Sequence, residues 1–367
     1  MRLKGAAVVL SLLLMSTALS GCGFKDIDKR FFVVAMGIDL PDEGKGFKVT
    51  LRLAVPSPKT EPGSAMSQIE TIQSQTIAEA VRLAKSHVDK ELDFGHCKIF
   101  VLGEKLIKQG YNDVLEWVTR RRDVQSVSYF AIGRPDAATI VKVQPPTERY
   151  PGNALFLAFG TDGTESSYSM TAYAFDFGRR AEEQGLDPVL PLIRKEKAME
   201  NYYITRIALL DKSKMVMLLT PQETQLYNQI ANHFGKSTVR SKVDNNNMVI
   251  AANSVRSHYD IVSGENGTHT LRLKLRVSGI IEEAPPGVYD QDWGKLEAGF
   301  SEQTAAEIKT MLEKIQKAGV DPFGFGLRYR ATHAGSPKTW EAWQQIYPEL
   351  QFDIRVKIHI EGTGLVR

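Results

Sequence analysis

The sequence has only two cysteines, Cys22 and Cys97, among its 367 residues. If Cys22 carries a lipid, as argued below, Cys97 has no partner within the chain and no disulfide is expected. Cys97 opens the apolar segment Cys97–Leu102, which reads as a buried strand. A free cysteine in such a segment most often acts as a small hydrophobic residue.

The chain also lacks a strong charge of either sign. The formal net charge is +3, and two of the cations, Arg2 and Lys4, lie in the first few residues. The remainder is nearly neutral, which gives no indication of a nucleic-acid partner. After Ala6–Ser20, no apolar run approaches the roughly 20 residues that a membrane-spanning helix needs. With 43% apolar and 24% charged residues, the composition is that of a globular protein.

Catalytic and metal-binding patterns are missing as well. His96 and Cys97 are adjacent, but neighbours on a strand point to opposite faces and cannot form a nucleophile–base pair. Gly324-Phe325-Gly326 follows a predicted helix rather than a strand and lacks the third glycine of a dinucleotide loop. The seven histidines form no H-E-x-x-H motif or close His/Cys cluster. We therefore predict no enzymatic activity, no cofactor and no metal site, with solvent-exposed positions for His258, His269, His333 and His359.

Two further groups of residues leave a choice open. Trp340 and Trp343, three residues apart on a predicted helix, would form either an aromatic platform for a ligand or part of the core. Arg120, Arg121 and Arg122 would form either a patch for anionic lipid or phosphate, or the cations favoured at a helix C-terminus. In both cases the structural interpretation is the more common one.

The most informative segment that is present lies at the N-terminus. Arg2 and Lys4 precede the fifteen-residue apolar run Ala6–Ser20, which has the length of a secretory h-region. Leu19-Ser20-Gly21-Cys22 then places a cysteine directly after small residues, a pattern that indicates a bacterial lipoprotein. We predict a lipoprotein signal peptide over residues 1–21, cleavage before Cys22, and attachment of diacylglycerol to the Cys22 sulfur. Two acyl chains, such as palmitate, anchor a protein stably. The alternative is an ordinary signal peptide followed by a chance cysteine.

Residues 22–134 alternate predicted strands and helices, and we assign them to an N-terminal α/β domain. Alternating apolar residues predict a hairpin of Phe31–Asp39 and Phe47–Val55. Thr76 and Glu79 form a capping box at the start of a helix. A second helix is predicted over Ile107–Arg121, and further strands over Cys97–Leu102 and Val127–Gly133.

Proline marks the next region. Pro145-Pro146 breaks the pattern, and Asp187-Pro188-Val189-Leu190-Pro191 is too rich in proline for a helix or a central strand. We interpret residues 135–200 as a connecting region or a small second domain.

Residues 201–367 are predicted to form a C-terminal α+β domain. The clearest strands, Leu271–Val277 and Asp353–Glu361, alternate apolar and basic side chains, as expected of a sheet with one wet face. The clearest helix is Thr304–Ala318, with a predicted Thr304/Glu307 capping box and a terminal Gly319. The whole chain is therefore expected to be a multi-domain α+β protein with mixed and antiparallel sheets and packed helices. Other elements expected here are the hairpin Ile204–Leu210 and Met215–Leu219, and the helix Thr220–Phe234.

Several strings, spread over most of the exported part, resemble the Ger(x)C family, the C-subunit lipoproteins of spore germinant receptors. The most specific is the Asp-Pro-Phe-Gly-Phe-Gly string at 321–326, after a long helix. Others are the lipid-bearing Cys22, Gly37-Ile38-Asp39, Thr76–Ala80, Phe94–Lys98, Leu102-Gly103-Glu104, Asp187–Pro191, Tyr347–Leu350 and Gly362–Leu365.

The resemblance implies a protein that is not an enzyme, with several α/β domains built on mixed sheets. It implies two integral-membrane partners, one bearing a large soluble domain and one resembling amino-acid transporters. The family's lipoprotein lies on the outer face of the spore inner membrane and acts in receptor assembly or signalling. No catalytic or nutrient-binding residue of the family transfers to a position in this sequence.

Two other functions fit the same leader. One is a solute-binding lipoprotein that serves a transporter, although the sequence shows no pair of matching lobes. The other is an exported hydrolase, which the missing catalytic residues disfavour.

Overall fold

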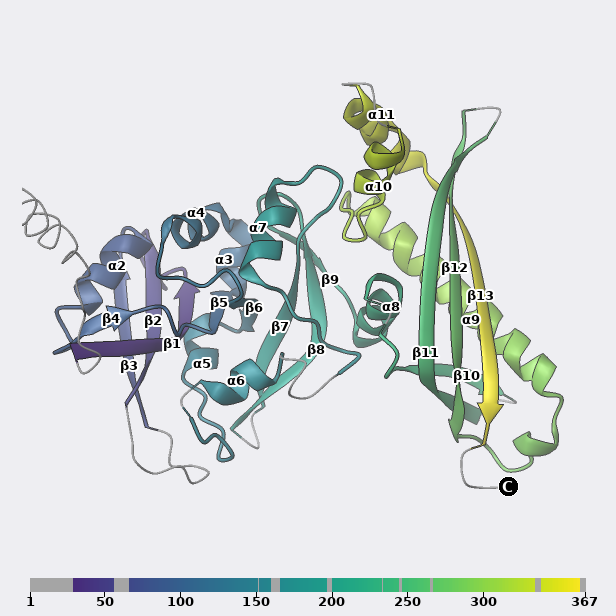
Figure 1. Cartoon of the computed structure of the whole chain (residues 1–367), viewed down its shortest axis with the longest axis horizontal. Coiled ribbons are helices and arrows are strands. Elements are labelled where there is room, and N and C mark those ends of the chain that lie inside the picture. The colour runs from purple at the N-terminus through teal and green to yellow at the C-terminus, as the bar shows by residue number, and fades with distance from the viewer. Residues whose placement is uncertain are drawn as a thin grey trace, which may run out of the picture.

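The structure is a computed structural model. It describes residues 29–55, 66–150, 152–159, 166–196, 200–232, 234–243, 246–264, 267–333 and 338–363. The predicted signal peptide and Cys22 lie outside the described residues. Two sheets, each packed with helices, lie beside one another along the long axis of the molecule (Figure 1). The α+β fold class expected from the sequence is confirmed.

The first sheet, sheet A, has nine strands among the described residues and mixes both directions of pairing. Its order is β3-β2-β1-β5-β6-β7-β8-β9, with β4 paired to β1. The β1–β5, β5–β6 and β6–β7 pairs are parallel, and the other pairs along this path are antiparallel. The strands are β1 (Arg30–Asp39), β2 (Phe47–Ala54), β3 (Ser67–Ser74), β4 (Glu91–Asp93), β5 (Ile99–Gly103), β6 (Tyr129–Arg134), β7 (Val189–Glu196), β8 (Asn201–Leu210) and β9 (Met215–Leu218).

The hairpin predicted at the start of this sheet is confirmed as β1 and β2, which pair antiparallel. Of the capping box predicted for the first helix, one half is confirmed, because the Thr76 hydroxyl accepts the Glu79 N–H at 3.1 Å. The Glu79 carboxylate accepts the Ser74 hydroxyl. The single helix predicted over Ile107–Arg121 is wrong. The chain leaves the helix at Gly110, and the Tyr111 N–H donates to the Ser213 carbonyl at 3.0 Å in the β8–β9 turn. The helices here are α2 (Ile77–Ala84), α3 (Glu104–Gln109) and α4 (Asn112–Arg120).

The described part of residues 135–200 carries three helices and β7. The prediction that Asp187–Pro191 excludes a central strand is wrong, since β7 lies between β6 and β8. Pro191 is tolerated because β6 pairs only with Leu192–Arg194, beyond the proline. The expected boundary at residue 200 falls between two paired strands, and sheet A continues to Leu218. The three helices are α5 (Ala137–Val141), α6 (Asn153–Leu157) and α7 (Ala174–Glu182).

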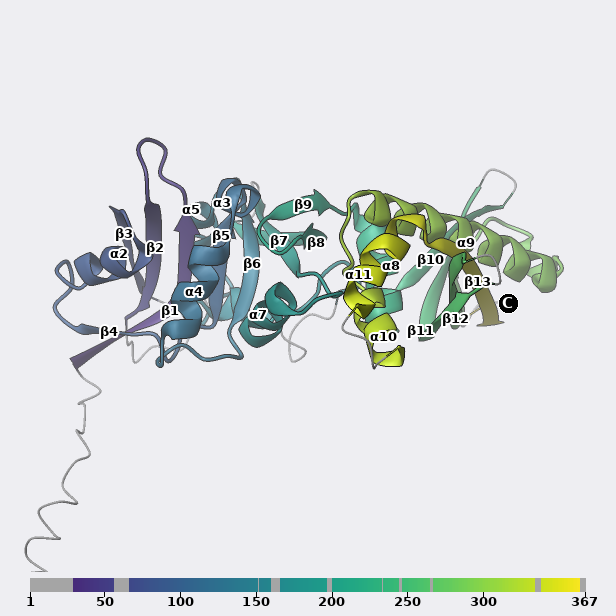
Figure 2. The same ribbon diagram turned by 90° about the horizontal axis from the view of Figure 1, so that it is seen from above.

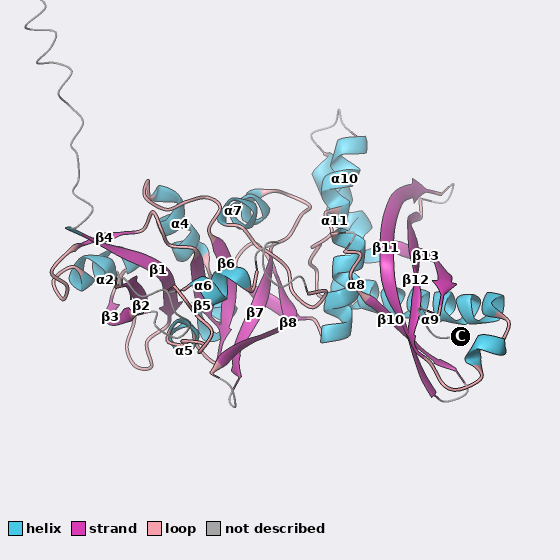
Figure 3. Ribbon diagram, turned by 60° about the horizontal axis from the view of Figure 1, so that its bottom comes forward, coloured by secondary structure: helices cyan, strands magenta, loops and turns pink. Residues whose placement is uncertain are grey.

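The second sheet, sheet B, has the order β10-β11-β12-β13, with β12 and β13 parallel. Its apolar face packs against α8 and α9 in one core, and the described helices of this half lie on that side of the sheet (Figures 2 and 3). The elements are β10 (Thr238–Val243), β11 (Asn246–Ser263), β12 (His269–Glu283), β13 (Gln351–Gly362), α8 (Pro221–Ala231), α9 (Trp293–Lys317), α10 (Phe325–Thr332) and α11 (Thr339–Ile346), with short 3₁₀ turns at Val288–Asp290 and Tyr347–Glu349.

The predicted start of the long helix at Thr304 is wrong. Helix α9 begins at Trp293, where the Asp292 carboxylate accepts the Gly294 N–H at 2.9 Å. Thr304 is buried inside the helix, so it caps nothing. Over the described ranges, no helix combines the length and the apolar character that crossing a membrane requires.

Candidate functional site

The two halves of the chain meet where two Asp-Pro steps face one another. The Asp187 N–H donates to the Asp321 carbonyl at 2.8 Å, and the Asp321 N–H donates to the Asp187 carboxylate at 2.6 Å. Asp187 precedes β7 of sheet A, and Asp321 follows α9 beside sheet B. This reciprocal pair therefore joins the two sheets through the backbone. We call the region formed by residues 180–188, Lys212 and residues 319–328 the seam.

The carboxylate of Asp321 organises the loop after α9. It accepts three backbone N–H groups, from Gly324 at 2.9 Å, Phe325 at 3.1 Å and Gly326 at 2.7 Å. Gly324 has a φ of +78°, a conformation that glycine adopts without strain. Burial raises the pKa of Asp321 to about 7, although the backbone hydrogen bonds oppose the change, and the nearby charge of Asp187 adds to it.

Close backbone contact explains the second glycine of the string. A Cβ on Gly326 would lie 2.3 Å from the indole nitrogen of Trp343 and 2.8 Å from the Cα of Gly185. A Cβ on Gly185 would lie 2.5 Å from the backbone of Gly326 and Leu327. The Leu327 N–H donates to the Gly185 carbonyl at 2.9 Å. Glycine is thus required on both sides of the seam.

Two cations complete the seam. The Lys212 ammonium donates to three carbonyls at the end of α7, those of Arg180, Glu183 and Leu186, at 2.6 to 2.7 Å. It also lies 3.1 Å from the Asp187 carboxylate. The Arg180 guanidinium donates to the carbonyls of Asp187 and Pro322 at 3.2 and 3.1 Å. The bond from Arg180 to the Pro322 carbonyl crosses between the two halves, whereas the Lys212 bonds hold the α7–β7 loop to the β8–β9 turn within the first half.

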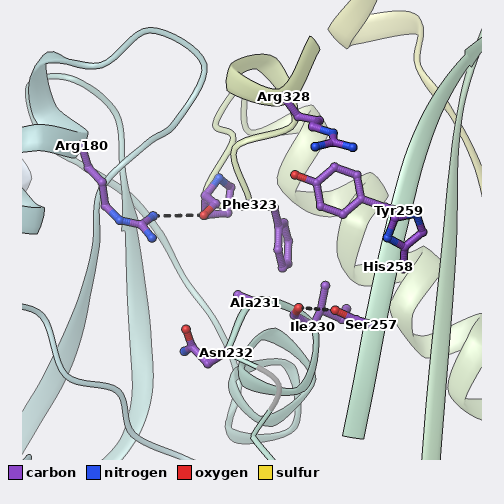
Figure 4. Close-up of a pocket in the computed structure, with 10 residues that line it drawn as sticks. Arg180, Ile230, Ala231, Asn232, Ser257, His258, Tyr259, Phe323 and Arg328 are labelled. Carbon is purple, nitrogen blue, oxygen red and sulfur yellow. Dashed lines mark hydrogen bonds between the residues drawn. The ribbon is translucent and has the colours of Figure 1, made fainter. Parts of the chain in front are cut away.

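A cavity of about 330 Å³ opens beside the seam (Figure 4). Arg180 of α7 lies on one side, and Arg328 of α10 and Tyr259 of β11 lie on the other. Burial raises the pKa of Tyr259 to about 12, so its hydroxyl is neutral at physiological pH. Arg328 is exposed and takes part in no ion pair with a described residue. The cavity therefore offers a cation, a hydroxyl and the exposed amide of Asn232, a set suited to hold a small anionic group.

A second cavity, of about 340 Å³, lies between the α7–β7 loop and α11. Trp340 is half-buried and lines it, together with Asp187 and Lys212. Trp343 is only 2% exposed and packs against the rings of Tyr329 and Tyr347 at 5.2 and 5.4 Å. The structural interpretation of Trp343 as a core residue is thus the correct one.

The remaining residues singled out in the sequence are dispersed. Cys97 is fully buried just before β5, and burial raises the pKa of its thiol to about 12. His96 is exposed and packs edge-on against Phe32, which separates it from the Cys97 thiol. The structure shows no group of three or more potential metal ligands among the residues it describes.

The arginine run lies at the C-terminal end of α4, with Arg120 in its last turn, Arg121 at its C-cap and Arg122 exposed beyond it. Arg120 pairs with Glu116, and Arg121 pairs with Asp123 while lying over the Phe94 ring at 4.4 Å. Of the four histidines expected at the surface, His258, His333 and His359 are exposed and His269 is half-buried.

Sequence reasoning missed the pairing across the seam. The sequence contains two Asp-Pro steps, Asp187-Pro188 and Asp321-Pro322, but no pattern indicates that they contact one another. No motif in the sequence indicates the role of Lys212. The repeated Asp-Pro step is the one feature that suggests a shared role, because a carboxylate before a proline often accepts nearby backbone N–H groups.

Comparison with known proteins identifies the family to which the two halves are similar. The family model "Spore germination protein N-terminal domain" matches residues 23–195, and "Spore germination B3/ GerAC like, C-terminal" matches residues 205–364. Spore germination protein KC of Bacillus subtilis (strain 168) is 24% identical, over 96% of this chain and 95% of its own. Spore germination protein GerQC of Bacillus cereus is 22% identical, over 96% and 98%.

A solved structure shares the fold. The crystal structure of the GerBC protein superposes with a TM-score of 0.58 at 17% identity, covering 90% of this chain and 98% of GerBC. Two family models that together span nearly all residues after Cys22 establish the assignment: this chain belongs to the Ger(x)C family of spore germination proteins.

Proposed function

We propose that the chain is the lipid-anchored subunit of a nutrient germinant receptor, acting in receptor assembly or signalling rather than in catalysis. Family membership supports a role in spore germination. The finer proposal adds diacylglycerol on Cys22, a position on the outer face of the spore inner membrane, and two integral-membrane partner subunits, one of them transporter-like.

The observation that carries the proposal is where the family match begins. The N-terminal family model starts at residue 23, directly after Cys22. This start supports a leader that is separate from the folded part, with Cys22 as the first residue of the mature chain. The described part begins a strand at Arg30, so only a few residues separate the proposed anchor from sheet A. A tether this short keeps the body near membrane partners and raises its effective concentration there.

The seam supports a scaffolding role. The bonds between Asp187 and Asp321, and the bond from Arg180 to the Pro322 carbonyl, connect the two halves. A body that keeps its shape presents its surfaces to partner proteins at a set spacing, which suits an assembly subunit. A solute-binding protein that closes around its ligand would need a hinge at this place instead.

Incorporation of a labelled fatty acid tests the anchor. We expect the wild-type protein to be labelled, Cys22→Ala to lose the label, and Cys97→Ala to keep it, since Cys97 is buried in the fold. Spores that lack the gene should stay dormant towards one nutrient and still respond to non-nutrient triggers. Labelling of Cys22→Ala, or a normal response to every nutrient, would refute the proposal.

A solute-binding lipoprotein remains the second candidate, favoured by the cavity between Arg180, Tyr259 and Arg328. A thermal-shift screen with amino acids, sugars and nucleosides separates the two. A clear rise in melting temperature with one solute, lost in Arg328→Gln, would favour solute binding.

A further inference from the structure

The outer face of sheet B carries a compact group of basic side chains, five of them arginine or lysine and one a histidine. Arg256 of β11 is the cross-strand neighbour of Arg276 of β12, and Arg276 is the neighbour of Lys357 of β13. The next row along the strands is His258, Lys274 and Arg355. All six side chains are exposed, and the helices of this half pack on the opposite face. We call these six residues the cation face.

Among the residues that the structure describes, four of the five arginine and lysine side chains of the cation face have no ion-pair partner. Arg355 pairs with Asp353 at 2.9 Å, and His258 with Asp260 at 3.2 Å. In contrast, Arg256, Arg276, Lys357 and Lys274 form no ion pair with any acidic group that the structure describes. Like charges directly opposite one another destabilise a sheet. The fold alone therefore gives no reason for this row, whereas an anionic partner would.

The surface of the cation face is also hollowed where the unpaired cations lie. A hollow of about 530 Å³ is lined by Arg256, Arg276 and Lys357, with Ser254, Ser278 and His359 around them. Adjacent strands lie about 4.8 Å apart, and alternate residues of one strand lie about 6.7 Å apart. The free charges are therefore confined to an area about two rows long and three strands wide.

Acidic residues limit this area at both ends. Asp260 and Asp353 flank Arg272 in the row beyond Lys274, and Arg272 lies 3.8 Å from Asp353. Glu361, near the other end, is hydrogen-bonded to Asn253 at 3.0 Å. A membrane surface spread over the face would bring anionic headgroups against these carboxylates. A narrow partner that follows β12 would avoid them.

One edge of sheet B, formed by β13, is partly occupied by helix α9. The Ile358 N–H donates to the Ser301 hydroxyl at 3.0 Å, and the Ile360 N–H donates to the Glu297 carboxylate at 2.8 Å. Helix α9 thus already occupies this part of the free edge of β13, where an added strand would otherwise pair.

From these observations we propose that the cation face is the docking surface for an extended acidic segment of a partner protein. An extended chain with a carboxylate at every second residue repeats at about 6.7 Å, the same spacing as the rows of the cation face. Such a segment would lie along β12 with its carboxylates between the strands. The inference deepens the receptor role proposed above and rests on it only for the identity of the partner.

Fluorescence anisotropy on the full-length protein, extracted in a non-ionic detergent, tests the docking surface directly. The probe is a labelled peptide of about ten residues in which glutamate and serine alternate, about 33 Å when extended, which is long enough to reach past both rows of the cation face. We expect binding that weakens with added salt. The triple change Arg256→Gln, Arg276→Gln, Lys357→Gln should weaken it about tenfold, from the loss of three modest charge contacts. A peptide with its glutamates in one block should bind more weakly than the alternating one.

The matched control is Arg82→Gln, Arg122→Gln, Lys317→Gln, which removes two exposed arginines and one exposed lysine elsewhere. This variant should bind the peptide within about twofold of wild type. Circular dichroism should show both variants folded, because every changed side chain is exposed. Three results would overturn the proposal: no binding by wild type, equal weakening in the control, or stronger competition by phosphatidylglycerol micelles than by phosphatidylcholine micelles. The last result would assign the face to lipid headgroups. None of these results bears on acylation of Cys22, so failure here leaves the labelling test intact.

Discussion

Replacing Gly326 by alanine tests the packing of the seam with a single methyl group. The new Cβ would lie 2.3 Å from the indole nitrogen of Trp343 and 2.8 Å from the Cα of Gly185, where ordinary contact begins at 3.4 Å. Both contacts must therefore lengthen, the one to Trp343 by about 1 Å and the one to Gly185 by about 0.6 Å. Trp343 is held between aromatic rings and Gly185 is held by its backbone, so neither moves freely.

Overpacking of this kind typically costs 1–3 kcal/mol, and we expect about 3 kcal/mol because both neighbours are confined. The matched control is Gly299→Ala. Gly299 is an exposed residue inside α9, and a Cβ there would meet nothing within 4 Å. That change should raise the free energy of unfolding by about 0.5–1 kcal/mol, the helical preference of alanine over glycine. The same substitution thus has opposite signs at the two positions.

Urea unfolding followed by far-ultraviolet circular dichroism measures both changes without relying on the fluorescence of Trp343. If Gly326→Ala is as stable as wild type within about 0.5 kcal/mol, the seam is looser than the structure indicates and the rigid-body account is wrong.

Three other changes probe the buried Arg52–Glu148 pair, the buried Asp321 and Lys212 of the seam. Arg52 pairs with Glu148 and both are buried, so Arg52→Ala should cost about 3–5 kcal/mol by leaving the Glu148 carboxylate without its partner, measured by urea unfolding; a cost below about 1 kcal/mol would show that the pair is open to water. Because burial raises the pKa of Asp321 to about 7, its stabilising contribution is complete below its unfolded pKa near 4 and is lost as the pH rises towards 7. Wild type should therefore lose about 2 kcal/mol more than Asp321→Asn between pH 5 and pH 7.5, and parallel pH profiles would contradict this assignment. Lys212→Met should cost about 2–4 kcal/mol, since three carbonyls lose a charged donor, and should speed proteolysis within residues 180–188; an unchanged cleavage pattern would count against its role in the seam.

The sequence predicted elements whose cause is local. The β1–β2 hairpin followed from alternating apolar residues, and the cap at Thr76 followed from the spacing to Glu79. The alternation in Leu271–Val277 correctly separated an apolar face from a charged one. In each case the residues that determine the structure are near neighbours in the chain.

The predictions were wrong where contacts between residues distant in the chain determine the structure. The turn at Gly110 depends on a bond from Tyr111 to Ser213, about a hundred residues away in the chain. The first turns of α9 carry Gly294 and Gly299, which weaken a helical pattern, so the predicted start fell at Thr304. Pro191 was read as excluding a central strand, but the limited pairing of β6 with β7 accommodates it.

The candidate site shows the same division. The Asp-Pro-Phe-Gly-Phe-Gly string at 321–326 was visible as a specific motif, yet its partner Asp187 is fixed only by tertiary packing. The cation face was visible as alternating basic residues on two strands. Its lateral rows were not, because they require the register of β11, β12 and β13.

Crosslinking in intact spore membranes, followed by mass spectrometric identification of the neighbours, tests the central claim most directly. If the chain is the anchored subunit of a germinant receptor, it should be recovered joined to two integral-membrane proteins, one of which resembles an amino-acid transporter. Recovery of the chain alone, unacylated and released from the membrane without detergent, would contradict the account.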